Sequence, residues 1–249
     1  MMADRRPQVE TDELVEVLIH DSCEVCPYLP ERTARMPLRL PSTTLTRRQM
    51  DLRLARGDRR SGPFLYRTEC PSCQACEPIR IEVDRFEFSR SQKRVFRRGE
   101  RELRVEVGEP IVDNQRVTMF NAHRDARGLV GRDGDIDEYG YDSFLVQSCC
   151  DSFEVRYRLE DELVGVAICD RGDESISAVY CHYNPVYRHL SLGTYSILKE
   201  IELCREWGVP FLYLGLYIVE SPHMSYKANF LPHQRLIDGR WETFYKQQS

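Results

Sequence analysis

The first part of the chain alternates short apolar stretches with long polar ones. Residues 14–19 (LVEVLI) are predicted to form a short apolar strand, and residues 79–88 (IRIEVDRFEF) alternate apolar and polar positions, as a half-buried strand does. Met50 and Leu54 have helical spacing, and Gly57 stands where it can cap that helix. This part is therefore predicted to hold short strands around few helices.

Three further elements follow towards the middle of the chain. Residues 89–102 place two apolar side chains among cations, and Ser89 or Ser91 can cap a short helix there. Residues 103–110 are strand-like, and a helix is expected from about Asp113 to Gly128.

The second part of the chain has a clearer strand pattern. Residues 153–159, 162–170 and 176–185 are predicted strands joined by tight hairpin turns. The strongest helical pattern covers residues 191–208, and a buried strand follows at 211–219. The order of a hairpin, a strand, a helix and a strand predicts a mixed sheet with helices on its faces.

Charge is unevenly distributed along the 249 residues. The net charge is −5, yet residues 85–104 carry eight cations against three glutamates, a local charge of +5, which leaves −10 for the remainder. Such a basic segment can hold an anionic partner, or it can be a solvated helix face. No apolar run approaches the ~20 residues that span a bilayer, and the first residues lack a signal-peptide core, so a cytoplasmic protein without a membrane partner is expected.

The chain contains ten cysteines, many for a protein of a reducing compartment. Five lie in apolar segments and are interpreted as core residues: Cys149, Cys150, Cys169, Cys181 and Cys204. The other five have C-x2-C spacing and offer thiolates for zinc or an iron–sulfur cluster: Cys23, Cys26, Cys70, Cys73 and Cys76. Packing of irregular loops by small side chains is the alternative interpretation.

Two other stretches carry candidate chemistry. Residues 187–195 (YRHLSLGTY) precede the strongest helix, where Gly193 allows either an anion site or a simple tight turn. Tyr226 and Lys227 follow the buried strand, where residues often line a cleft, although a lysine there can also be exposed. The sequence contains neither a G-x-S-x-G elbow nor an H-E-x-x-H motif, which argues against serine and zinc hydrolases.

Several blocks, in order from about residue 20 to residue 245, resemble the bacterial aminoacyl-tRNA–protein transferases. They include CPYLPERTARMPL, RRSGPFLYRTECPSCQACEPIRIEVDRFEF, SLGTYSILKEIELCREWGVPFLYLGLYI and MSYKANFLPHQRLIDGRW. The chain is most similar to the aspartate/glutamate leucyltransferases, which are relatives of the eukaryotic arginyltransferases.

The resemblance implies an activity and an architecture. Leucine would pass from leucyl-tRNA to the α-amine of proteins beginning with Asp or Glu, which creates an N-degron for protein degradation. The implied fold is α+β, with an N-terminal transferase domain (1–108) packed on a C-terminal acetyltransferase-like (GNAT) mixed-sheet domain (109–249). An aminoacyl ester is already activated, so transfer requires no cofactor.

The resemblance also suggests roles for particular residues. Tyr226 and Lys227 are assigned to catalysis at the aminoacyl end, and Tyr180, Gly193 and Tyr217 to the lining of the cleft. The acidic residue of the acceptor is assigned to Arg60, Tyr66 and Arg67, because arginine can bind a carboxylate in bidentate fashion. The tRNA backbone is assigned to Arg90, Lys93, Arg94, Arg97 and Arg98.

The chain departs from the family pattern in places. Residues 216–227 read LYIVESPHMSYK, with Ser221 and His223 where relatives differ, and residues 128–144 match poorly. Arginyl-tRNA therefore stays open as the alternative donor, and an acetyl-CoA-dependent GNAT acetyltransferase is a more distant alternative. Cys23 together with Cys26 restores a C-x2-C that contributes to an iron–sulfur site in the eukaryotic relatives.

Overall fold

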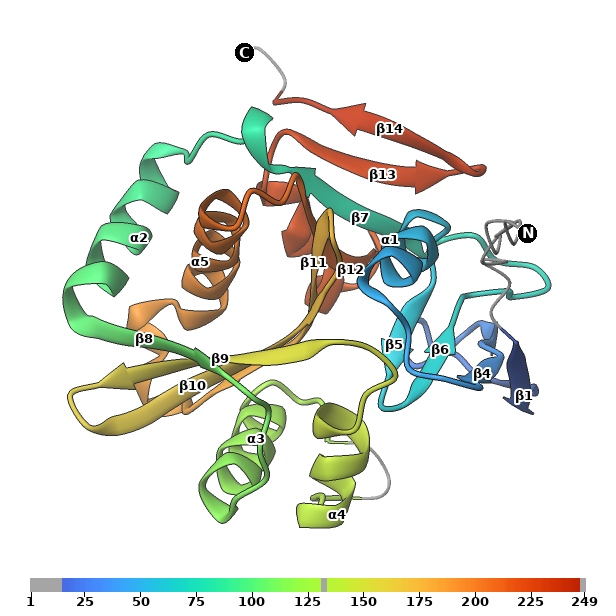
Figure 1. The fold of residues 1–249 in the computed structure, drawn as a ribbon, viewed down its shortest axis with the longest axis horizontal. Coiled ribbons are helices and arrows are strands. Elements are labelled where there is room, and N and C mark those ends of the chain that lie inside the picture. The colour runs from blue at the N-terminus through green and yellow to red at the C-terminus, as the bar shows by residue number, and fades with distance from the viewer. Residues whose placement is uncertain (1–14, 131–133, 247–249) are drawn as a thin grey trace, which may run out of the picture.

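The computed structural model describes residues 15–130 and 134–246 (Figure 1). Residues 1–14, which include the first residue of the strand predicted at 14–19, and residues 131–133 of the poorly matching stretch 128–144 lie outside the described residues. Within the described ranges, no helix is long and apolar enough to cross a membrane.

An eight-stranded sheet, the large sheet, organises the molecule. In spatial order its strands are β14 (Arg240–Phe244), β13 (His233–Ile237), β7 (Glu77–Glu82), β12 (Phe211–Tyr217), β11 (Ser175–Tyr183), β10 (Glu162–Arg171), β9 (Ser152–Leu159) and β8 (Leu103–Gly108). The β11–β12 pair is parallel, and the other described pairs of this sheet are antiparallel. The predicted mixed sheet is confirmed.

A four-stranded sheet, the small sheet, lies beside the large one (Figure 1). Its strands, in order, are β1 (Glu16–His20), β4 (Leu38–Pro41), β6 (Phe64–Tyr66) and β5 (Arg59–Ser61). The loop between β1 and β4 contains one further pair, β2 (Cys23–Val25) with β3 (Thr33–Arg35).

Helices cover both faces of the large sheet. Figure 1 shows α2 (Arg90–Glu102) and α5 (Leu192–Glu206) on one face, and α3 (Asn114–Ala126) and α4 (Glu138–Tyr141) on the other. The main core lies under α5, where Tyr195, Leu198 and Ile201 are fully buried against the sheet. Short helical turns follow β7, α4 and β11, and α6 (Pro222–Ser225) and a turn at Tyr226–Asn229 follow β12.

Local sequence explains where the helices begin. Thr46 caps α1 (Arg47–Ala55) and Ser89 caps α2, each in a capping box with a glutamine three residues on. Asp113 caps α3, because its carboxylate accepts from the backbone N–H of Arg116. These predicted helices are therefore confirmed, as are the buried Met50 and Leu54 of α1.

The predicted strand over residues 79–88 is shorter than expected. β7 ends at Glu82, and a 3₁₀ turn over Val83–Arg85 replaces the last residues. This turn buries both Val83 and Phe86, which a continuous strand would place on opposite faces.

The large sheet joins parts of the chain that are distant in sequence. β7 pairs with both β12 and β13, and β8 pairs with β9. Strands from residues 1–108 therefore complete a sheet whose centre comes from residues 109–249. The division at residue 108 stays a prediction.

The central strands separate after a short common stretch. β11 and β12 pair only at Ser175–Ser177 with Phe211–Tyr213, although both strands continue for several residues. Beyond this stretch the two strands are not paired by backbone hydrogen bonds, which leaves room for a cavity between them.

Candidate active site

A cavity of about 1100 Å³ occupies the space beside the separated strands β11 and β12. Its walls come from the small sheet, α3, the ends of β11 and β12, the start of α5 and residues 221–227. Segments from both halves of the chain thus build one site.

Arg59 of β5 enters this cavity as a buried cation. Its side chain is 7% exposed, one Nη donates to the carbonyl of Ala178 on β11 at 3.1 Å, and Nη1 has no hydrogen-bond partner among the described residues. Burial lowers the pKa of Arg59. An unpaired buried guanidinium is costly, which makes it a strong candidate for binding an anion.

Lys227 reaches the same region from the opposite wall. It is 7% exposed, and Nζ donates to the carbonyl of Leu216 on β12 at 2.7 Å and contacts the Met224 sulfur at 3.2 Å. Burial, together with the charge of Arg59, lowers the pKa of Lys227 to about 7. The interpretation of Lys227 as an exposed lysine is therefore wrong.

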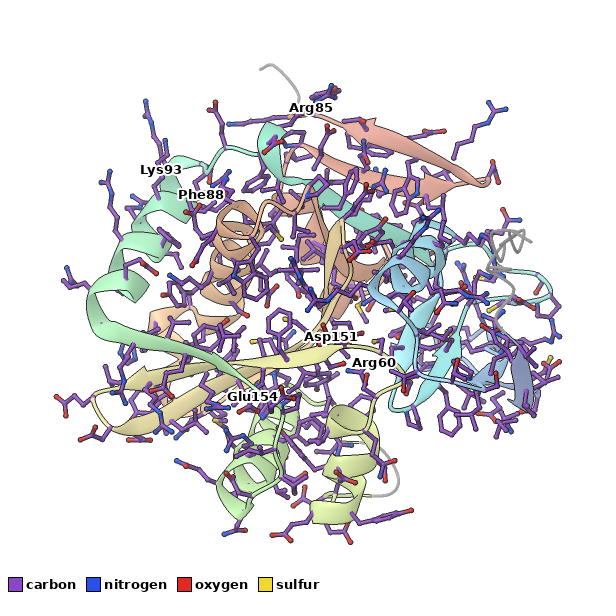
Figure 2. The ribbon with its side chains drawn as sticks, in the orientation of Figure 1. Arg60, Arg85, Phe88, Lys93, Asp151 and Glu154 are labelled. Atoms are coloured by element: carbon purple, nitrogen blue, oxygen red, sulfur yellow. The ribbon has the colours of Figure 1, made fainter. Side chains whose placement is uncertain are left out.

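The neighbours of Arg59 in sequence already have partners. Asp58 is fully buried against Arg39, with Nη2 to Oδ1 at 2.7 Å. Arg60 forms a buried ion pair with Asp170 of β10, with Nε to Oδ1 at 2.8 Å, where the small sheet meets the large one (Figure 2). Neither carboxylate forms an ion pair with Arg59, although the charge of Asp170 partly offsets the lowering of the Arg59 pKa by burial.

The wall built by α3 and β11 combines aromatic rings with cations. Phe120 and Tyr180 lie with their ring centroids 5.3 Å apart. Arg124 stacks on Phe120 at 5.5 Å, and the guanidinium of Arg127 lies 3.5 Å from His223 Nδ1. All five residues line the cavity. Such a surface suits unstacked nucleobases and their phosphates.

One carboxyl group lies at the α5 side of the cavity. Glu200 is buried, and its Oε1 accepts from Ser196 Oγ at 2.8 Å, which itself accepts from Tyr157 at 2.9 Å. Burial raises the pKa of Glu200 to about 7. The described cavity therefore carries more cationic than anionic side chains.

Comparison with known proteins identifies the family. Residues 24–94 match "Arginine-tRNA-protein transferase, N terminus", and residues 115–237 match "Arginine-tRNA-protein transferase, C terminus". The chain belongs to the arginine-tRNA-protein transferase family. The family predicted from the sequence blocks is thus confirmed.

Relatives within this transferase family are similar over most of their length. The aspartate/glutamate leucyltransferase of Thiobacillus denitrificans is 37% identical over 87% of this chain and 90% of that protein. The enzyme of the same name from Nitrosospira multiformis is 38% identical over 87% of this chain and 86% of that protein. A solved structure, the C-terminal domain of a putative lysylphosphatidylglycerol synthetase from Agrobacterium fabrum, shares 13% identity with a TM-score of 0.46 over 64% of this chain and 54% of that one.

In this transferase the cavity collects most of the residues predicted for the site. Its lining includes Arg60, Tyr66, Tyr180, Gly193, Tyr226 and Lys227. Two predicted residues are not among the described lining residues. Arg67 interacts with Asp58 and Glu69 at 3.5 and 3.9 Å, and Tyr217 is buried with Arg235 over its ring at 4.7 Å.

Sequence reasoning missed Arg59, Arg124 and Arg127 of this transferase. The paired arginines at 59 and 60 carried a signal, because consecutive strand residues point to opposite faces, but the pattern does not say which one is held by a carboxylate of the chain itself. No sequence signal separates Arg124 and Arg127 from the solvated face of an ordinary helix.

The cations predicted to bind tRNA lie on α2, and all five are exposed: Arg90, Lys93, Arg94, Arg97 and Arg98. These are called the α2 cations. Arg98 donates to the carbonyl of His189 at 2.8 Å, next to the turn that leads into α5 and the cavity. Figure 2 shows Lys93 on the outer rim of the molecule. Within the described ranges, none of the five α2 cations has a carboxylate partner.

The predicted metal site has no formed ligand set. Among the described residues, no three or more His, Cys, Asp or Glu side chains are arranged to hold a metal ion. Cys23 is exposed on β2, Arg32 donates to Cys73 at 3.2 Å, and the Arg35 backbone N–H donates to Cys70 at 3.4 Å. Burial and the neighbouring thiols, Cys26 included, raise the pKa of Cys76 to about 12. The side chains as placed do not fit a metal, and no reaction step is assigned to one.

Of the five cysteines predicted as core residues, four are confirmed and Cys181 is not. Cys149, Cys150, Cys169 and Cys204 are buried, and half-buried Cys181 lines the cavity.

Proposed function

We propose that this protein transfers leucine from leucyl-tRNA to the N-terminal α-amine of proteins that begin with Asp or Glu. The observation that carries the proposal is the cavity, which joins buried unpaired cations to an aromatic and cationic wall. Cations suit an acidic acceptor, and the wall suits the single-stranded 3′ end of a tRNA. Family membership and the names of the relatives, aspartate/glutamate leucyltransferases, support the same reaction.

The reaction needs positioning rather than a covalent intermediate. The α-amine attacks the carbonyl carbon of the aminoacyl ester, a C–N bond forms, and the C–O bond to the terminal ribose breaks. The amine loses a proton, and the departing ribose oxygen gains one. An enzyme accelerates this by aligning amine and ester and by stabilising the oxyanion. No cofactor is required by this chemistry.

We assign Tyr226 and Lys227 to the reacting end. Lys227 titrates near neutrality, so it can take the proton from the amine in its neutral form and return it to the leaving oxygen. The α-amine of a protein has an ordinary pKa of about 8, close enough for efficient proton exchange. Tyr226 lies beside Lys227 in the cavity lining and is 40% exposed.

Leucine fits the cavity better than arginine does. Arg59, Lys227, Arg124 and Arg127 make the cavity cationic, so an arginyl side chain would meet like charges. Apolar side chains for a leucyl group come from Val179, Ile197, Leu214, Leu216 and Met224. Arginyl transfer remains the alternative because of the family's name.

The finer points of the architecture also belong to this proposal. The mixed sheet of residues 109–249, with its separated β11 and β12, supports an acetyltransferase-like arrangement in which the gap between strands holds the acyl donor. We place the enzyme in the cytoplasm, where aminoacyl-tRNA is made, and its product in the N-degron pathway.

A charged-tRNA transfer assay tests the proposal. Radiolabelled leucyl-tRNA and arginyl-tRNA are offered side by side to a peptide beginning with Asp and to its N-acetylated form. Label from leucyl-tRNA on the free peptide alone supports the proposal. Transfer of arginine alone would establish the alternative donor, and no transfer from either tRNA would refute both.

A further inference from the structure

Arg59 and Lys227 form an unusual pair of buried charges. Each is 7% exposed, each donates to a strand carbonyl, and neither has a carboxylate partner in the part of the chain that the structure describes. Two cationic groups without a paired carboxylate are costly to bury, and the lowered pKa of Lys227 reflects that cost. Their burial is therefore understandable if a ligand supplies the negative charge.

The strand geometry of β5 selects Arg59 for this position. Successive strand residues alternate between faces, so Arg59 and Arg60 diverge, and Arg60 is held by Asp170. Tyr66 pairs with Arg59 across the β5–β6 ladder, so both side chains lie on the same face of the small sheet, and both line the cavity. Burial raises the pKa of Tyr66, which therefore stays a neutral hydroxyl beside the guanidinium.

Gly215 keeps the space between the two cations open. A Cβ at this position would lie 3.1 Å from an Arg59 Nη and 3.6 Å from Lys227 Nζ, so the two nitrogens are within about 7 Å of each other. The φ of +83° at Gly215 also belongs to the region that favours glycine. Nη1 of Arg59, which has no hydrogen-bond partner among the described residues, is the nitrogen left to bind a carboxylate.

We propose that Arg59, facing the gap at Gly215, is the anchor that recognises the side-chain carboxylate of the acceptor's first residue. This rests on the proposed function and adds a specificity-determining residue to it. The carboxylate and α-amine of an N-terminal Asp are only about 4–5 Å apart, so anchoring on Arg59 delivers the amine towards Lys227. Arg60 and Arg67, engaged by carboxylates of this chain, have structural roles in this account.

Peptide binding without tRNA tests the anchor directly. Calorimetry compares two peptides that differ only in Asp or Asn at the first position, using the wild type, Arg59→Met, Arg59→Lys and Gly215→Ala. Arg85→Met serves as the control, because Arg85 is 60% exposed and outside the cavity. The wild type and the control should prefer Asp by at least about 30-fold, and Arg59→Met should bind both peptides equally.

The two other variants refine the expectation. Arg59→Lys keeps the charge but loses the planar guanidinium that can bind a carboxylate through two N–H groups. It should therefore retain only part of the preference for the Asp peptide over the Asn peptide. Gly215→Ala should weaken binding of the Asp peptide because its Cβ fills the gap beside the guanidinium. The ratio of the affinities for the Asp and Asn peptides, measured on one preparation, does not depend on the fraction of folded protein. A destabilised variant therefore remains informative.

Each outcome decides one claim. If Arg59→Met keeps the wild-type Asp preference, or if the wild type binds both peptides equally, Arg59 is not the anchor, even where leucine transfer is observed. If the preference is present and depends on Arg59 while no leucine is transferred, the anchor stands and the proposed donor is wrong.

Discussion

Lys227 shows at the scale of one residue how burial prepares a group for chemistry. Its ammonium is bonded to a carbonyl and a thioether rather than to a carboxylate, and the pKa falls to about 7. In the unfolded chain the same lysine titrates near its ordinary pKa of 10.5. Between these values the unfolded chain binds more protons than the folded one, so stability rises with pH in this window.

This linkage gives a measurable prediction for Lys227→Met. The variant lacks the titrating group, so the free energy of unfolding of the wild type should gain about 2 kcal/mol relative to the variant between pH 7 and pH 9. Urea unfolding of both proteins at the two pH values measures the difference. If the free energy of unfolding changed by the same amount in both proteins between pH 7 and pH 9, Lys227 would titrate at its ordinary pKa in the folded state.

At the scale of an element, Gly99 makes the closest approach between α2 and α5 possible. A Cβ at Gly99 would lie 2.1 Å from the ring of buried Tyr195, and the Tyr195 hydroxyl donates to Glu100 at 2.7 Å. Gly99 therefore lets α2 approach α5 closely enough to fix its position.

Gly99→Ala should destabilise the protein despite alanine's better helix propensity. Overpacking against Tyr195 is expected to cost about 1–3 kcal/mol in the free energy of unfolding, more than the gain of up to ~1 kcal/mol from propensity. Arg101→Ala, at an exposed position of the same helix, is the control and should change little. A Gly99→Ala protein as stable as the wild type would mean that α2 moves aside at no cost.

The elements show where sequence reasoning succeeds and where it fails. Capping residues such as Ser89 and Asp113 act on their own helix, so local sequence predicts those helices well. The pairing of β7 with β12 and β13 joins distant segments, and no local pattern contains it. Lys227 was found because it follows a buried strand, whereas Arg59 needed the three-dimensional partners of Asp58 and Arg60 to be known.

At the scale of the whole molecule, charge is divided between regions. The α2 cations give a basic surface on a chain of net charge −5, and none of the five has a carboxylate partner in the described ranges. Phosphate binding by such a surface releases counterions and makes affinity depend on salt.

Charge reversal on α2 tests this surface. Lys93→Glu with Arg97→Glu should weaken leucyl-tRNA binding at least about 10-fold and reduce the log–log salt slope by about 2. Arg240→Glu with Lys246→Glu makes the same net change at exposed positions of β14 and the residues after it, and should have a small effect. Equal weakening by the two pairs would contradict a specific role for α2.

The central claim, leucyl transfer to acidic N-termini, is tested most directly by a competition experiment. The wild-type protein receives leucyl-tRNA and arginyl-tRNA in equal amounts, with peptides that begin with Asp, Glu or Asn, and mass spectrometry identifies every product. The account predicts leucine on the Asp and Glu peptides and very little on the Asn peptide. Arginine as the transferred residue, or equal modification of the Asn peptide, would contradict it.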